Sequence, residues 1–186
     1  MKKKWQFIKE EKVYSDNILS IRHLEYYYKT ADKSMVFTVQ DMSSWAVIVP
    51  VTKNGEFILV KQFRAGTNSD TLEFPGGSIN KNEDIAHAAA RELQEETGAV
   101  SGSIIPLGVI DPNPAFMTNK CYAFAALDCT FDGVQQLDLF EDTEPIVVTE
   151  DGFKQMLKTG EFSQSLSVAA YLSLIHISEP TRPRLI

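Results

Sequence analysis

The chain has 186 residues, of which 44% are hydrophobic and 23% are charged, and its formal net charge at pH 7 is −7. This length is typical of about one domain, and the composition is that of a folded globular protein rather than a disordered chain. The acidic balance argues against nucleic acid or an anionic membrane as the main partner, because both attract clustered Lys and Arg. The two cysteines, Cys121 and Cys129, are too few for a disulfide framework or a four-Cys zinc site.

The sequence shows neither a membrane span nor a secretory signal. No stretch approaches the roughly 18 apolar residues that a span needs. The charged residues 9–12 come before any apolar region, which a secretory signal peptide does not allow. We therefore expect a cytoplasmic catalyst or binder with no membrane and no nucleic-acid partner.

The first half of the chain reads mainly as strands. Aromatic and β-branched residues fill segments 5–14 and 19–30, and the turn Ser15-Asp16-Asn17 between them predicts an antiparallel hairpin or meander. Asn54-Gly55 is a strong hairpin signal between two apolar runs. Further short strands are expected at residues 36–39, 45–51, 57–62 and 71–74.

Helices enter in the second half of the chain. The pattern predicts a helix over residues 84–97, ended by Gly98 as its left-handed cap. Strands are expected at 103–110, 122–126 and 146–149, with a Pro-rich loop at 111–114, and helices near 150–158 and 164–171. Strands dominate, and helices lie between or after them, so the fold class is α+β with a mixed sheet.

The helix over 84–97 carries carboxylates on its apolar side. At about 100° per residue, Glu92 and Glu96 fall within the stripe formed by Ala88, Ala89 and Leu93. Buried carboxylates without a partner are strongly unfavourable, and neighbouring ones repel each other. One arginine, Arg91, cannot neutralise them all, so oxygen ligands on one helical face indicate a hard divalent cation. The alternative is an ordinary solvated Glu-rich helix.

The spacing around this helix resembles a known family. Gly77 is followed after five residues by Glu83, and after seven more by Arg-Glu-Leu-Gln-Glu-Glu-Thr-Gly at 91–98. This order matches the Nudix box, G-x5-E-x7-R-E-U-x-E-E-x-G-U, except that Ala99 replaces a larger aliphatic residue. The resemblance implies the Nudix fold, a mixed sheet sandwiched between helices, and hydrolysis of a nucleoside diphosphate linked to a further group.

The resemblance also implies the residues that bind metal. It identifies the Gly76 carbonyl, Glu92 and Glu96 as ligands of Mg²⁺, with Mn²⁺ possible, and places Glu95 beside them as ligand or water-orienting group. Glu83 and Arg91 would anchor the loop and the helix.

Two further segments resemble the branch that contains ADP-ribose and nucleotide-sugar pyrophosphatases. They are Val60-Lys61-Gln62-Phe63-Arg64 and Glu73-Phe74-Pro75-Gly76-Gly77. The resemblance implies that Arg64 contacts a phosphate or the terminal ribose and that Glu73 lies at the metal-side lip of the site. A surface position at a strand end is the alternative for Arg64.

Residues after the box extend this comparison. Pro114 stands where ADP-ribose pyrophosphatases carry a marker proline, although its context is Asn-Pro-Ala here rather than Ser-Pro-Gly. In the acidic run 138–144, Glu144 corresponds to a loop carboxylate that joins the metal site and Asp142 to the general base. Glu141 could replace Asp142, and a merely solvated loop is the alternative.

The resemblance further implies a homodimer, in which residues 1–40 form a dimerisation region of strands and 41–171 the Nudix domain. One of Tyr14, Tyr26, Tyr27 and Tyr28 would then stack on a nucleobase across the dimer. Residues 172–182 resemble the translation of a sequencing-library adapter, so we expect 172–186 to be an artefactual tail. The expected substrate is a small nucleotide, either ADP-ribose or a nucleoside diphosphate sugar. Hydrolysis of nucleoside triphosphates or dinucleotides, or ligand sensing without catalysis, are the alternatives.

Overall fold

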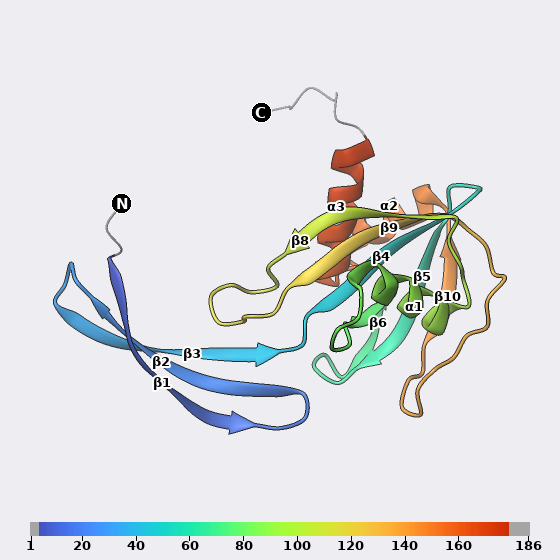
Figure 1. Cartoon of the computed structure of the whole chain (residues 1–186). Helices are drawn as coiled ribbons and strands as arrows, with labels where there is room; N and C mark the ends of the chain where they lie inside the picture. The colour runs from blue at the N-terminus through green and yellow to red at the C-terminus, as the bar shows by residue number, and fades with distance from the viewer. Residues whose placement is uncertain (1–3, 179–186) are drawn as a thin grey trace, which may run out of the picture. The chain divides into compact units, whose positions relative to one another are not determined.

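The computed structural model describes residues 4–178 of the chain (Figure 1). They divide into two compact units. The first, here called the strand unit, consists of residues 4–44 and 111–120. The second, the sandwich unit, consists of residues 45–110 and 121–178.

The strand unit is a three-stranded antiparallel sheet in the order β1-β2-β3, which confirms the predicted N-terminal antiparallel strands. The Asp16 carboxylate closes the first turn by accepting hydrogen bonds from the backbone N–H groups of Ile18 and Leu19, both at 2.8 Å. The strands are β1 (Trp5–Ser15), β2 (Leu19–Tyr28) and β3 (Lys33–Met42).

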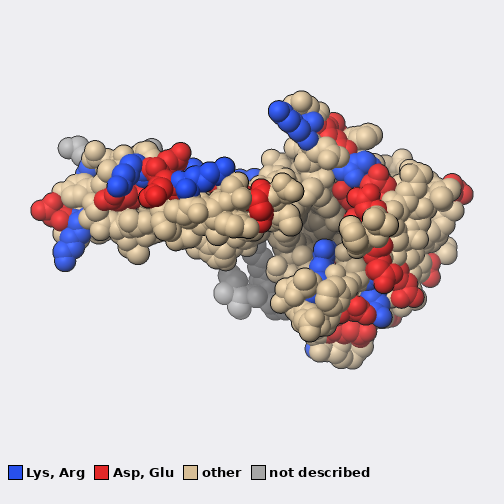
Figure 2. Space-filling view, turned by 90° about the horizontal axis from the view of Figure 1, so that it is seen from below, with Lys and Arg blue, Asp and Glu red and all other residues tan. Residues whose placement is uncertain are grey.

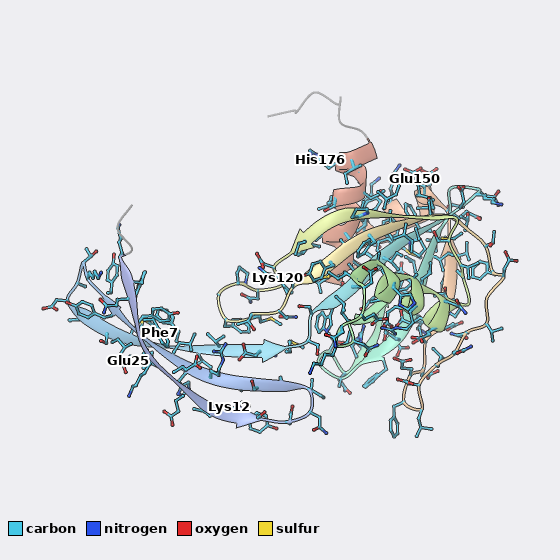
Figure 3. The ribbon with its side chains drawn as sticks, viewed as in Figure 1. Phe7, Lys12, Glu25, Lys120, Glu150 and His176 are labelled. Carbon is cyan, nitrogen blue, oxygen red and sulfur yellow. The ribbon has the colours of Figure 1, made fainter. Side chains whose placement is uncertain are left out.

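One face of this sheet is aromatic. Trp5 stacks on Tyr28 with ring centroids 4.4 Å apart, and Phe7 meets Tyr26 edge-on at 5.5 Å. The opposite face carries charged side chains such as Glu25, which neighbours Tyr26 on β2 and therefore points to the other side (Figure 3 labels Phe7 and Glu25). Trp5 is 41% exposed and Phe7 50% exposed.

Segment 111–120 joins the strand unit through β3, a contact that the sequence did not predict. The backbone N–H of Gln40 donates to the carbonyl of Phe116 at 2.7 Å, and the N–H of Thr118 donates to the carbonyl of Gln40 at 3.1 Å. The predicted loop around Pro114 is thereby attached to the strand unit.

The sandwich unit is built on a mixed sheet in the order β10-β5-β4-β9-β8, with β6 added to β5 and β7 to β4. Strands β4 and β9 are parallel, and the other pairs are antiparallel. The strands are β4 (Trp45–Thr52), β5 (Phe57–Arg64), β6 (Ser69–Glu73), β7 (Gly76–Ser78), β8 (Ser103–Ile110), β9 (Cys121–Cys129) and β10 (Glu144–Val148).

Helices cover both faces of this sheet (Figure 1). Alternate residues of β4 enter different cores, because side chains alternate across a strand. Val47 packs with residues of α2 (Glu150–Thr159) and α3 (Ser165–Ser178), whereas Ile48 packs with residues of α1 (Ile85–Thr97). The predicted α/β/α arrangement is confirmed.

Helix α1 begins and ends where its sequence predicts. The Asp84 side chain accepts the N–H of His87, and Gly98 adopts a left-handed conformation with φ of 70°. Asp and Gly are favoured at these two positions because they satisfy groups that the helix ends leave unpaired.

Helix α3 is longer than predicted. It continues past Tyr171 to Ser178, and Leu174 and Ile175 pack against the core that contains Tyr171. These two residues follow Tyr171 by three and four positions, so they lie on the same helical face. The helix therefore includes the first residues of the adapter-like segment, and 179–186 lie outside the described residues. Among residues 4–178, no helix is long and apolar enough to cross a membrane.

The core beneath α2 and α3 is a cluster of rings centred on Phe153. Phe153 is fully buried and lies within 5.4 Å, between ring centroids, of Phe57, Phe74, Phe162 and Tyr171.

We expect Phe153→Ala to lower the free energy of unfolding by about 3–5 kcal/mol, because it removes a ring and leaves a cavity. Phe140, which is 94% exposed, provides the matched control. In urea denaturation, Phe140→Ala should change the free energy of unfolding by less than about 0.5 kcal/mol. Equal losses in the two variants would contradict the central role of Phe153 in this core.

Candidate active site

A cavity of about 1180 Å³ opens in the sandwich unit. Its walls come from β4 to β7, α1, the loop before β10 and the start of α3. Figure 2 shows Asp and Glu side chains, interrupted by Lys and Arg, along the visible face of this unit.

Helix α1 contributes buried carboxylates to the cavity, as its sequence predicts. Glu92 is 9% exposed and Glu96 is 4% exposed, and both line the cavity. Burial raises the pKa of Glu96 to about 8 and also raises the pKa of Glu92, because a charged carboxylate loses its hydration there. Two groups that are costly to keep ionised thus stand side by side.

Arg91 holds two carboxylates of this helix, Glu92 and Glu95, in place. Its Nη1 lies 2.8 Å from Oε1 of Glu92 and 2.7 Å from Oε2 of Glu95, and its Nε lies 2.8 Å from Oε1 of Glu83. Arg91 and Glu95 are four residues apart on the helix, a spacing that favours such an ion pair. The hydrogen bonds from Arg91 lower the pKa of Glu83 to about 2, so this carboxylate stays ionised as an anchor.

Strand β7 brings the backbone unusually close to α1. The N–H of Gly76 donates to Oε2 of Glu96 at 2.9 Å. A Cβ atom at Gly77 would lie 2.6 Å from the Glu92 carboxylate, and one at Gly76 would lie 2.3 Å from the carbonyl oxygen of Ala46. Position 76 therefore requires glycine, because the obstacle there is backbone, whereas a side chain at position 77 would displace the Glu92 carboxylate.

Arg64 and Glu73 line the cavity and bind each other. Arg64 donates from Nε and Nη2 to the two Glu73 carboxylate oxygens, each at 2.8 Å, and Thr71 donates to Oε1 of Glu73 at 2.6 Å. Glu73 is buried and Arg64 is half-exposed, so the guanidinium keeps one side open to the cavity.

The loop before β10 places Glu141 and Asp138 in the cavity wall, whereas Asp142 and Glu144 do not line it. Glu144 begins β10 and pairs with Lys61 of β5, which fixes it in the sheet. The charge of Glu141 acts on both Glu92 and Glu96.

Two hydrogen bonds attach this loop to the end of α1. The side-chain nitrogen of Gln135 donates to the carbonyl oxygens of Glu96, at 2.7 Å, and Thr143, at 2.9 Å. The backbone N–H of Gln136 donates to the carbonyl of Glu95 at 2.9 Å. Pro114, in contrast, belongs to the strand unit and is absent from the lining of the cavity.

Sequence reasoning assigned no role to Gln62, which lines the cavity from β5. Its side-chain nitrogen is buried and has no hydrogen-bond partner within residues 4–178. A buried donor of this kind is costly unless a ligand or water accepts its hydrogen bond. The sequence feature that could have predicted this position is its spacing: Gln62 precedes Arg64 by two residues and therefore lies on the same face of the strand.

The carboxylates of the cavity fit a divalent cation that is shared with a phosphate group. Among residues 4–178, no three His, Cys, Asp or Glu side chains are close enough together to hold a metal ion alone. Mg²⁺, however, commonly keeps several waters and is bound by one or two carboxylates together with substrate phosphates. Glu92 and Glu96 each use one oxygen in the hydrogen bonds described above, to Arg91 and to Gly76, and the second oxygen of each accepts no hydrogen bond from residues 4–178.

Comparisons with known proteins agree with this architecture. The NUDIX domain model matches residues 42–164, well over half of the chain. The chain is 32% identical over 109 residues to an ADP-ribose pyrophosphatase of Bacillus subtilis, covering 58% of this chain and 59% of that protein. It is 38% identical over 101 residues to an ADP-ribose pyrophosphatase of Saccharomyces cerevisiae, covering 53% of this chain and 40% of that protein. The chain thus spans about half the length of these relatives.

A solved structure shows the same fold. The crystal structure of an ADP compounds hydrolase matches with a TM-score of 0.84 over 96% of both chains, at 20% sequence identity. At that identity the likeness concerns the fold. The domain match and the box on α1 together confirm the family that the spacing predicts, and the chain belongs to the NUDIX domain family.

Proposed function

We propose that this protein is a divalent-metal-dependent hydrolase that cleaves the diphosphate of ADP-ribose or of a nucleoside diphosphate sugar. The products would be a nucleoside monophosphate and a sugar phosphate. The observation that carries the proposal is the pair of buried carboxylates, Glu92 and Glu96, facing a large cavity with one oxygen each available. The names of the two relatives favour ADP-ribose as the first substrate to test.

Glu92, Glu96 and the Gly76 carbonyl, with Glu95 beside them, would hold Mg²⁺ or Mn²⁺. Such a cation, when bound, neutralises charge on the diphosphate and lowers the pKa of water. The burial of both carboxylates favours cation binding, since a bound cation offsets the cost of their ionised forms.

A carboxylate of the loop before β10 would accept the proton of the attacking water. Among Glu141, Asp142 and Glu144, the first is favoured because its residue lines the cavity. As water attacks one phosphorus, the bridging P–O bond breaks and the second phosphate leaves with its sugar. Arg64 would contact a phosphate or the distal ribose with the open side of its guanidinium, while Glu73 keeps it in place.

The aromatic face of the strand unit favours a homodimer. Trp5 and Phe7 are exposed on it together with Met35, which is 55% exposed. Exposed apolar patches beyond a few hundred Å² usually mark an interface. We infer that two copies of the chain associate through this face.

The function is tested by incubating the protein with Mg²⁺ and a panel of nucleoside diphosphate sugars, dinucleotides and triphosphates, and identifying the products. We expect ADP-ribose or a nucleotide sugar to be cleaved fastest.

Glu96→Gln should reduce turnover at least about 10²–10³-fold, on the scale of losing one electrostatic stabiliser. Glu150→Gln, which changes an exposed carboxylate on α2, is the control. Preferred cleavage of triphosphates would replace the substrate assignment, and binding without turnover would favour a ligand sensor.

The buried carboxylate also predicts a pH dependence of stability. In the metal-free protein, Glu96 keeps its proton up to a pKa of about 8, whereas the unfolded chain loses it near the ordinary glutamate value. Stability should therefore fall as pH rises between about 5 and about 8, by at most about 1.4 kcal/mol per pH unit. Melting curves recorded in EDTA at different pH values measure this loss, because each kcal/mol lowers the melting temperature by about 2–4 °C. Glu96→Gln should flatten the dependence of melting temperature on pH. If the slope is unchanged in this variant, the pH dependence comes from other groups.

The proposed dimer predicts a different response from the two faces of the strand unit. Phe7→Asp places a charge on the aromatic face and should shift sedimentation at micromolar concentration towards the monomer. Glu11→Lys alters charge on the opposite face and should leave the dimer intact. A monomer in the unmodified protein, or a dimer unaffected by Phe7→Asp, would rule out this interface.

A further inference from the structure

The cavity reaches both faces of the sheet in the sandwich unit. On the α1 face it is lined by the carboxylates and by Gln62 and Arg64. On the other face it is lined by Cys121 and Leu166, which belong to the core beneath α2 and α3, and by Trp45, which packs against that core. We call this second part of the cavity the α3 lobe.

The backbone fixes Trp45 at the junction of the two parts. Trp45 pairs with Ser78 of β7 on one side and with Cys121 of β9 on the other. Strand β7 also contains Gly76, whose N–H binds Glu96. The backbone of Trp45 therefore pairs with the same short strand that approaches the carboxylates.

The indole ring of Trp45 has no partner that matches its chemistry. It is half-buried against the core, and no other aromatic ring within residues 4–178 stacks on it. Its N–H group makes no hydrogen bond to the described part of the protein. Because Trp45 is only half-buried, this donor is open to solvent in the cavity, and the ring face and the N–H at the cavity wall are both available to a ligand.

Polar groups complete the α3 lobe at the start of α3. The Gln164 side-chain oxygen accepts the N–H of Ser167 at 2.6 Å and so caps the helix. This contact fixes the amide and leaves its nitrogen as a donor without an acceptor among the described residues. The lobe thus combines an aromatic face with free donors, which suits a flat or puckered ring that carries acceptor atoms.

We propose that Trp45 forms a stacking wall for a ring of the substrate, either the nucleobase or the sugar, and thereby determines specificity. This inference rests on the proposed hydrolase function and adds to it a residue outside the box and outside the strand unit. The diphosphate would lie beside α1, while one of its two end groups lies in the α3 lobe.

The chain allows a direct test because it has only two tryptophans, Trp5 and Trp45. In Trp5→Phe all tryptophan emission comes from Trp45, and the aromatic face of the strand unit is retained. We expect saturable quenching of this emission by ADP-ribose in rapid mixing with Mg²⁺. AMP and ribose 5-phosphate, the two halves of ADP-ribose, then identify the ring that stacks on Trp45. Quenching by AMP indicates the nucleobase, and quenching by ribose 5-phosphate indicates the sugar.

Turnover provides a second readout. In the Trp5→Phe parent, Trp45→Leu should raise KM for ADP-ribose about tenfold while kcat changes little, since stacking contributes to uniform binding. Trp45→Phe keeps a ring and should retain most of the affinity. Circular dichroism checks that these variants fold. The fluorescence measurement does not depend on their folding, because Trp45 is unchanged in it.

The outcomes separate this inference from the proposed function. Turnover of ADP-ribose with unchanged Trp45 emission and an unchanged KM in Trp45→Leu would overturn the stacking wall and leave the hydrolase intact. Quenching by AMP or ribose 5-phosphate without hydrolysis of any diphosphate would support the wall and overturn the hydrolase. Neither quenching nor hydrolysis would overturn both.

Discussion

Glu92 and Glu96 occupy positions on α1 where a helix packed on a sheet normally carries apolar side chains. Their ionised forms are costly there, because a buried carboxylate loses hydration that only a cation or strong donors can replace. The surrounding structure supplies such groups: Arg91 beside Glu92, and the backbone N–H of Gly76 beside Glu96. The N–H of Gly76 on β7 and the cavity beside α1 both meet these two carboxylates, whereas the neighbouring backbone of β4 is what requires glycine at position 76.

The same strand connects the two cores of the sandwich unit. β7 adds only three residues to the edge of β4, yet these residues contact the α1 carboxylates and pair with the backbone of Trp45. Helices cover both faces of the sheet, and the loop before β10 and the start of α3 complete the wall of the cavity.

Much of this architecture could be predicted from local sequence. The helix caps Asp84 and Gly98 and the burial of the α1 carboxylates follow from patterns within a few residues, whereas the α/β/α layering came from the resemblance to the Nudix box. What local sequence could not give were contacts between distant segments. The pairing of Arg64 with Glu73, the attachment of segment 111–120 to Gln40 and the exposure of Glu141 to the cavity depend on tertiary packing. β7 was missed because three residues with two glycines carry no strand pattern.

The loop before β10 has its fixed points at its base rather than at its tip. Gln135 and Gln136 tie its first residues to the last turn of α1, and β10 fixes its far end, whereas Leu139 and Phe140 are 89% and 94% exposed. Insertions or deletions at the tip would therefore leave α1 undisturbed, since exposed loop tips tolerate changes in length. Because Glu141 directly follows this tip and lines the cavity, a change in tip length would displace the Glu141 carboxylate while the carboxylates of α1 stay in place.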